Sequence, residues 1–194
     1  MYWRVRKISP DQVMKTYGVH AICIVSVLFN LVLFSKANPA KGLNTEQKTN
    51  FDTFARNVTR HILDGCFVTY EASMIQLCFN GSKSELGPQA QQTLVQMDEV
   101  IPRTMDNMRA VSRQLKEAKS VSQISIDDVK MEDPTSQGLV PIEVGGRVVK
   151  HSAEGLMGPN GFRFKYFVGI AKKGDVETPV VVNFQDISGQ APQQ

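Results

Sequence analysis

The most hydrophobic stretch of the chain is Gly18–Phe34, which contains no Asp, Glu, Lys or Arg although charged residues flank it on both sides. An α-helix of this length rises about 26 Å, close to the hydrocarbon thickness of a bilayer. The pattern therefore predicts a transmembrane helix. The predicted parts are a basic head (1–17), the span (18–34), a tether (35–44), a folded body (45–190) and a polar tail (191–194).

After the tether, apolar residues recur at steps of three and four, which is the period of an amphipathic helix. Asn44 is the predicted N-cap, with Gln47 three residues later as in a capping box. Gly65 is the predicted stop of this helix. Its apolar face consists of Phe51, Phe54, Val58 and Ile62.

Two further helical segments are expected before the pattern changes. Thr69 is the predicted cap of a short helix that ends at the turn Asn80-Gly81-Ser82. A longer segment begins near Pro88, a residue favoured at the first helical position, and keeps its apolar period as far as Ile101. Pro102 is expected to break or kink it before helical spacing resumes.

From residue 121 the apolar period becomes two, which is typical of strands buried on one face. The alternation slips at Asp127-Asp128, which indicates a β-bulge, and Gly145-Gly146 is expected to bend the second strand. Turns are expected at 158–161 and 172–175. The four predicted strands, joined by short links into an antiparallel meander, are Val121–Met131, Leu139–Lys150, Phe162–Ile170 and Val176–Ile187.

Helices followed by consecutive strands predict an α+β fold, with the helices packed on one face of a four-stranded antiparallel sheet. The glycine and bulge signals in two strands predict that this sheet is strongly curved. A curved sheet that cups N-terminal helices is the cone-like arrangement of the nuclear-transport-factor-two-like fold, which is therefore the expected fold of the body.

The formal net charge of +3 is concentrated in the head, because the chain from Gly18 onward holds 18 basic and 18 acidic residues. A body that binds nucleic acid directly would normally carry a basic excess, so no direct nucleic-acid partner is expected. By the positive-inside rule, the head is expected in the cytoplasm and the body on the far side of the membrane.

A cleaved signal peptide is the alternative interpretation of the hydrophobic segment. Ser35-Lys36-Ala37 is a small-x-small triplet, and cleavage near Ala37 would release a secreted or periplasmic cone-fold ligand binder or enzyme. The apolar stretch is longer than the usual signal core of about 7–15 residues. A lysine inside the triplet also fits a cleavage site poorly, so a retained anchor is favoured.

Polar residues in the span and cysteines in the body are further candidates. His20 and Asn30 would make polar contacts between spans of an oligomer, or would both reach water near the two membrane interfaces. Cys66 and Cys78 would face an oxidising compartment, where they either pair as a disulfide or stay free.

The sequence contains no nucleophile-elbow, zinc-protease, P-loop, dinucleotide-binding or EF-hand motif. A catalytic site inside a cone would recruit Asp127, Asp128 and Tyr166. The two aspartates, however, are typical of a bulge, and Tyr166 falls on an apolar face. We therefore expect no enzymatic activity, no metal and no cofactor.

A basic patch is predicted on the outer face of the sheet. It consists of Arg147, Lys150, Arg163 and Lys165. Such a patch is either an ordinary solvated surface or the docking site of an acidic partner.

The order of the segments resembles the bitopic inner-membrane component of type IV secretion and conjugation machines, namely the eighth VirB component and its TraE-type relatives. Four stretches match the first helix and the last three strands of that family in position and hydrophobic pattern: FDTFARNVTRHILDG, PIEVGGRVVKHS, GFRFKYFVGIAKK and VETPVVVNFQDISG. The Asn-Pro-containing loop of many VirB-type members is missing, which favours a TraE-like relative.

The resemblance implies a non-enzymatic scaffold or assembly factor of a type IV secretion or conjugative DNA-transfer machine. It implies a single-pass protein of the bacterial inner membrane, with a cytoplasmic N-terminus and a periplasmic C-terminal domain. The implied partners are further copies of the same chain, as a homo-oligomer, and other secretion-channel or pilus-assembly proteins.

Overall fold

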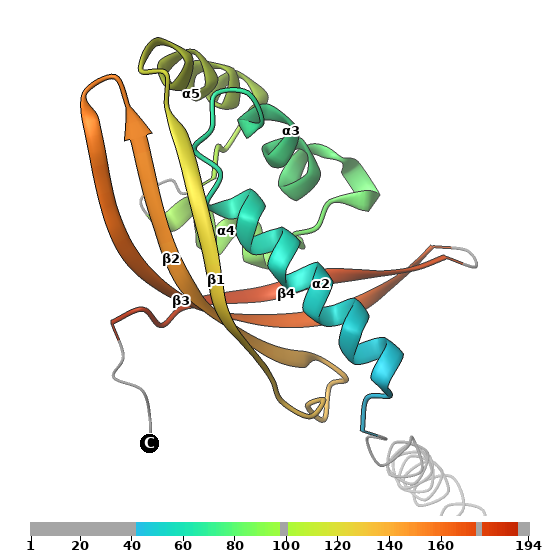
Figure 1. The fold of residues 1–194 in the computed structure, drawn as a ribbon. Coiled ribbons are helices and arrows are strands. Elements are labelled where there is room, and N and C mark those ends of the chain that lie inside the picture. Colours follow the sequence, from blue (N-terminus) through green and yellow to red (C-terminus); the bar gives the residue numbers. More distant parts are fainter. Residues whose placement is uncertain (1–41, 98–100, 174–175, 190–194) are drawn as a thin grey trace, which may run out of the picture. The chain divides into compact units, whose positions relative to one another are not determined.

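A computed structural model describes residues 42–97, 101–173 and 176–189 (Figure 1). The head, the predicted span with His20 and Asn30, and the alternative cleavage site near Ala37 lie outside the described residues. None of the helices within the described ranges is long and apolar enough to cross a membrane.

The first described helix, α2 (Thr45–Ile62), begins with the predicted capping box. The backbone N–H of Gln47 donates to Asn44 Oδ1 over 2.7 Å, and the Asn44 N–H donates to Gln47 Oε1 over 3.1 Å. Because both bonds satisfy donors that the helix itself leaves unpaired, they fix where it starts. The predicted stripe is confirmed, since Phe51, Val58 and Ile62 are buried.

Three helical segments follow α2. A helix α3 (Tyr70–Met74) continues into a π-helical turn η1 (Ile75–Phe79), and a 3₁₀ turn η2 (Gly81–Lys83) replaces the predicted turn. Thr69 occupies the N-cap position of α3 as expected, but its side chain makes no capping hydrogen bond.

Two longer helices, α4 (Pro88–Gln96) and α5 (Met105–Glu117), complete the helical part. The prediction that the apolar period keeps the backbone helical as far as Ile101 is wrong, because α4 ends at Gln96. Pro102 disfavours the helical conformation at the residue before it, and Ile101, which is not helical, is buried in the core.

The strands β1 (Val121–Met131), β2 (Val140–Ser152), β3 (Gly155–Lys173) and β4 (Val176–Asp186) form one sheet in the order β1-β2-β3-β4. Every neighbouring pair is antiparallel, so the predicted meander is confirmed. The predicted bulge is also confirmed, because the β1–β2 register shifts between Ile126 and Asp128.

The glycines opposite this bulge are required by close packing. A Cβ on Gly146 would overlap the Ser125 backbone oxygen, and a Cβ on Gly145 would overlap the Asp128 carboxylate. The two strands therefore approach more closely here than side chains would allow.

The expected turn at 158–161 is wrong, because these residues lie inside β3. The chain reverses earlier, after Ser152, which pairs with Gly155. Gly158 and Pro159 sit opposite the register shift between Val148 and Lys150, where proline needs no ladder partner. Gly158 also has a φ of +111°, which only glycine adopts readily. The Gly-Pro pair therefore forms a bulge and not a turn.

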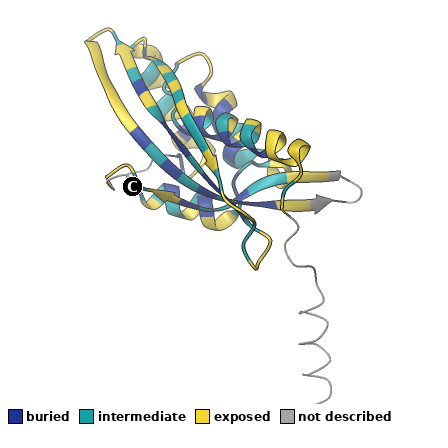
Figure 2. Cartoon of the chain, turned by 60° about the horizontal axis from the view of Figure 1, so that its bottom comes forward, coloured by how far each residue is buried: buried dark blue, intermediate teal, exposed yellow. Residues whose placement is uncertain are grey.

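All the described helices lie on one side of the sheet, as Figure 1 shows, and this arrangement confirms the predicted α+β class. Figure 2 shows buried residues on the strands where they face the helices. The inner face of the sheet supplies Ile142, Val144, Phe162, Phe164, Tyr166, Val168, Val181 and Phe184 to the core.

The edge strand β4 is covered at its middle. The Val181 N–H donates to Glu85 O over 2.9 Å, and Val181 O accepts from the Gly87 N–H over 2.8 Å. The segment around Leu86 therefore forms a short parallel bridge to β4. Among the described residues, no segment pairs with the edge of β1 that faces away from β2.

Candidate interaction surface on the outer sheet face

The sheet face that points away from the helices carries alternating charged residues of three strands. We call it the outer face and define it by Ser125, Asp127, Asp128, Lys130, Glu143, Arg147, Arg163, Lys165 and Phe167. None of the described helices lies over this side of the sheet (Figure 1).

Ion pairs connect the three strands across this face. Arg147 Nε lies 3.2 Å from Asp127 Oδ2, and both Nη atoms of Arg163 lie 3.2 Å from the carboxylate oxygens of Asp128. The bulge in β1 makes this arrangement possible, because it turns two consecutive aspartates toward the same face. The fork of Arg163 matches the carboxylate geometry, which makes this pair bidentate.

Lys165 closes the row of charges. Its Nζ lies 2.6 Å from Glu132 Oε1 and 3.2 Å from Glu143 Oε1, and 21% of its side chain is exposed. The hydrogen bond that Lys165 donates to Glu132 is the main reason that the pKa of Lys165 is raised, and partial burial opposes it. The lysine is thus held in its charged form by two carboxylates.

The predicted basic patch is wrong in its electrostatics. Three of the four basic side chains on the outer face, all except Lys130, pair with four carboxylates, so the surface is a mixed-charge row without a basic excess. Such exposed pairs each contribute about 0–1 kcal/mol to stability. Their more distinctive effect is to fix a pattern of alternating charge that a partner must match.

The predicted patch is also wrong in its membership, because Lys150 lies on the helix side of the sheet. A Cβ on Gly65, at the end of α2, would lie 3.8 Å from Lys150 Cε. The cause is the alternation of β2, whose pairing with β1 is unbroken here: Lys150 lies three positions after Arg147, so the two side chains fall on opposite faces. Lys150 shares the inner side with the buried Val144 and Val148, and Arg147 keeps its predicted side.

Apolar side chains interrupt the charges near the end of the outer face. Phe167 is half-buried between the inward-facing Tyr166 and Val168. The side chains of Leu139 and Val182 pack close to Gly169. A Cβ added to this glycine would lie 3.1 and 3.2 Å from their methyl groups. A mixed apolar and charged surface is typical of non-obligate protein interfaces. The apolar part of this surface could be predicted from the sequence, because the alternation of β3 places Phe167 on the outward side.

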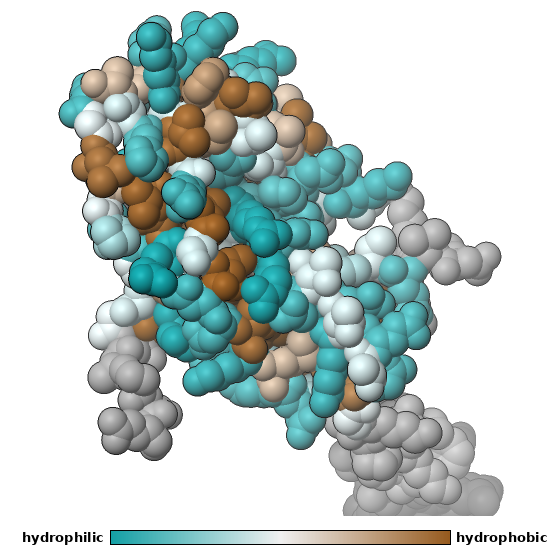
Figure 3. Space-filling view, in the orientation of Figure 1, coloured by the Kyte–Doolittle hydropathy of each residue, from teal (hydrophilic) through white to brown (hydrophobic). Residues whose placement is uncertain are grey.

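A second exposed apolar cluster lies at the tip of the β2–β3 hairpin. Leu156 and Met157 are 61% and 63% exposed. Val121 is close to them in the sheet, because His151 pairs with both Val121 and Leu156. Figure 3 shows hydrophobic side chains at the upper left, where Figure 1 places this hairpin. The sequence did not predict this cluster, because the expected turn at 158–161 placed the tip of the hairpin several residues later.

Cys66 and Cys78 are free cysteines, so the alternative of a disulfide between them is not realised. The helical segment from α3 to η1 separates them, and eight helical residues rise about 12 Å, well beyond the Cα distance that a disulfide spans. Burial raises the pKa of the Cys78 thiol to about 12, with a smaller contribution from Glu85. This thiol is therefore a poor nucleophile.

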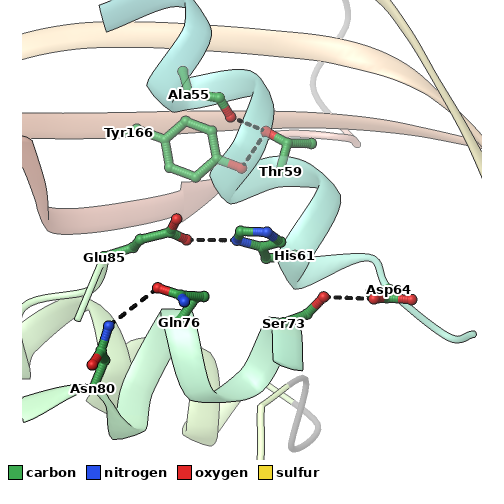
Figure 4. A network of polar contacts seen from close by, with 9 residues as sticks. All are labelled: Ala55, Thr59, His61, Asp64, Ser73, Gln76, Asn80, Glu85 and Tyr166. Carbon is green, nitrogen blue, oxygen red and sulfur yellow. Dashed lines mark hydrogen bonds and ion pairs between the residues drawn. The ribbon is translucent and has the colours of Figure 1, made fainter. Parts of the chain in front are cut away.

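The residues that a catalytic cup would recruit lie on opposite faces. Asp127 and Asp128 are on the outer face, whereas Tyr166 is fully buried beneath α2. Figure 4 shows the Tyr166 hydroxyl 2.8 Å from Thr59 Oγ1, which itself donates to Ala55 O over 2.8 Å. The proton of Thr59 is already used, so Tyr166 is the donor. Burial raises the pKa of Tyr166 above its usual range, and the hydroxyl stays protonated.

The histidine on α2 also has a structural partner. His61 Nδ1 lies 2.8 Å from Glu85 Oε2, which ties α2 to the segment that covers β4 (Figure 4). Within residues 42–97, 101–173 and 176–189, no three His, Cys, Asp or Glu side chains are grouped to hold a metal ion.

The described fold defines an α+β domain of four antiparallel strands with helices on one face. No protein-family model, no curated protein and no solved structure matches the chain.

Proposed function

We propose that this chain is a non-enzymatic scaffold or assembly factor of a type IV secretion or conjugative transfer machine. In this proposal Gly18–Phe34 anchors the chain in the bacterial inner membrane, with the head in the cytoplasm and the body in the periplasm. The body would be a cone of the nuclear-transport-factor-two-like type that self-associates and contacts other channel or pilus-assembly proteins.

The observation that carries this proposal is the outer face, a whole sheet surface that no described helix covers. Its fixed alternation of charge and its apolar margin suit recognition of a protein partner. Two further features agree with an anchored scaffold: the uncharged segment ahead of the domain, and an excess of basic residues confined to the head.

Membrane fractionation with protease access tests the anchor. The full chain is expected to stay in the membrane pellet after high-salt and alkaline washes, because a spanning helix is not released by salt. External protease is expected to degrade the body in spheroplasts. A chain that is found in the cytosol, or that salt releases, would contradict the proposal, as would a mature N-terminus near Asn38.

Site-specific photo-crosslinking tests the outer face. A photoreactive amino acid replaces Ser125, which is exposed on that face, and in a matched variant replaces Arg60, which is exposed on α2. We expect specific crosslinks to copies of the chain or to co-purifying envelope proteins from position 125 only. Equal crosslinking from both positions, or none from position 125, would refute the role of the outer face.

Disulfide crosslinking tests the predicted span. In the proposed oligomer, Asn30→Cys is expected to give dimers under mild oxidation, whereas a cysteine placed on the opposite side of the same helix is not. If both positions crosslink equally, the span does not pair through a defined face.

A further inference from the structure

A cavity of about 460 Å³ opens between the end of α2, the start of α5 and the helix-facing side of β2 and β3. Its volume falls in the range of small-molecule sites, roughly 300–1,000 Å³. Its walls include Ile62, Tyr70, Val111, Leu115 and Val148, which are apolar or aromatic. It lies on the helix side of the sheet and shares no residue with the outer face.

Lys150 is the charged group that this cavity presents without a protein partner. Among the described residues its ammonium group makes no ion pair and no hydrogen bond within the limits of 4.0 and 3.5 Å. The alternation of β2 places its side chain on the same side as Val148, in the cavity wall and away from the charges of the outer face. A lysine in this position is available to an incoming anion.

The carboxylate in the cavity wall is held by hydrogen bonds on both of its oxygens and does not bond to this lysine. Asp64 Oδ1 accepts from the Cys66 N–H over 2.9 Å, and Asp64 Oδ2 accepts from the Ser73 hydroxyl over 2.5 Å (Figure 4). These bonds hold both carboxylate oxygens toward the turn before α3. The neighbouring Tyr70, whose pKa burial raises to about 12, stays protonated at physiological pH.

Polar groups that carry no negative charge complete the opening. Asn107, at the start of α5, and Asn160, on β3, line the cavity. The Lys150 ammonium and the two amides offer donors to an anion, while the walls favour an apolar body.

We propose that this cavity binds a small organic anion that joins a carboxylate to an apolar or aromatic body. The carboxylate lies against Lys150 and the asparagines at the mouth, and the apolar body packs between α5 and β2. The inference is independent of the proposed scaffold role, because it uses neither the outer face nor the membrane anchor.

A fluorinated aryl acid tests the proposal by ¹⁹F NMR on the full chain. The probe is 4-[4-(trifluoromethyl)phenyl]butanoate, and its primary amide is the neutral control. We expect saturable line broadening, with the acid bound at least roughly tenfold more tightly than the amide, which corresponds to the lower end of what one charge-assisted hydrogen bond contributes. Equal affinities of acid and amide, or no saturable binding of the acid, would overturn the proposal.

Two pairs of variants locate the site. Lys150→Gln is expected to reduce binding of the acid to that of the amide, whereas Lys130→Gln, the same change on the outer face, leaves both unchanged. Gly65→Leu extends a side chain into the cavity and is expected to weaken acid and amide alike, whereas Gly42→Leu, in open space, does not. Because all variants share one buffer, partition of the probe into lipid or detergent is common to them.

The variant results also have a refuting outcome. If Lys150→Gln and Lys130→Gln lower the affinity equally, the anion is attracted by overall charge and not by this cavity. Thermal melts followed by circular dichroism confirm that each variant is folded before its binding is compared.

Discussion

The buried hydrogen bond between α2 and β3 makes an asymmetric prediction about two substitutions. The Tyr166 hydroxyl donates to Thr59 Oγ1, and Thr59 in turn donates to Ala55 O one helical turn earlier. In Tyr166→Phe the donor disappears, and Thr59 keeps its bond to the helix. In Thr59→Val the acceptor disappears, and a fully buried phenol is left without a partner.

The magnitudes follow from what each substitution leaves behind. A lost hydrogen bond whose remaining partner is still satisfied costs about 0.5–1.5 kcal/mol. A buried donor left unpaired costs about 1–3 kcal/mol. We therefore expect Thr59→Val to lower the free energy of unfolding by more than Tyr166→Phe does. The double variant should lose less than the sum of the two, because it removes the unpaired phenol.

Urea unfolding followed by circular dichroism at 222 nm measures the three free energies. Thr49→Val is the matched control, since Thr49 Oγ1 also donates to a carbonyl one turn back on α2 but is exposed. That control should change stability by only a few tenths of a kcal/mol, mostly through helix propensity. A loss for Tyr166→Phe equal to or above that for Thr59→Val, or strict additivity in the double variant, would refute the assigned donor and acceptor.

Three further predictions concern the sheet and its buried thiol. Gly146→Ala is expected to destabilise the domain by at least about 2 kcal/mol, because the new Cβ would overlap the Ser125 backbone oxygen in a paired strand; thermal melting measures this loss. Asp128→Asn should cost about 1 kcal/mol or less by removing the charge that Arg163 pairs with, and the loss should shrink when urea unfolding is repeated in 1 M salt. The raised pKa of Cys78 means that the unfolded chain loses this proton first, so stability should fall from about pH 8.5 toward pH 12 by up to about 1.4 kcal/mol per pH unit. Cys78→Ala should flatten that decline below pH 10, where the tyrosines are still protonated, as urea unfolding across this pH range would show.

Each of these predictions has a control and an outcome that contradicts it. Gly161→Ala should be tolerated, since the nearest atom would lie 4.0 Å from the new Cβ, and an equal loss there would rule out the overlap as the cause. A salt-independent loss in Asp128→Asn would mean that the charge is not what stabilises the pair. If Cys66→Ala flattens the alkaline decline as much as Cys78→Ala does, burial of Cys78 is not its source.

Local patterns in the sequence predicted the elements whose determinants lie within a few residues. The capping box of α2 and its apolar stripe are contained in one helix, and both were confirmed. The slip of alternation at Asp127-Asp128 likewise located the bulge, because the extra residue displaces the hydrophobic period of its own strand.

Features that depend on pairing between distant residues could not be predicted this way. The composition of 158–161 is typical of a turn, yet the ladder with β2 keeps it extended. The place of Lys150 is different, because it follows from the alternation of β2 alone and could have been predicted. Arg163 and Asp128, 35 residues apart, meet only because β3 and β1 flank β2, where Gly145 leaves room between them. The sequence therefore predicted the charges of the outer face but not their pairing.

The short bridge between Leu86 and β4 has a consequence for assembly by strand addition. With Val181 N–H and C=O both in use, β4 cannot accept one continuous added strand from another copy. The edges left for strand addition are β1 and the first part of β3, before Phe164, which β4 does not pair with. The bridge therefore protects the centre of β4 from edge-to-edge association and leaves such contacts to these two strands.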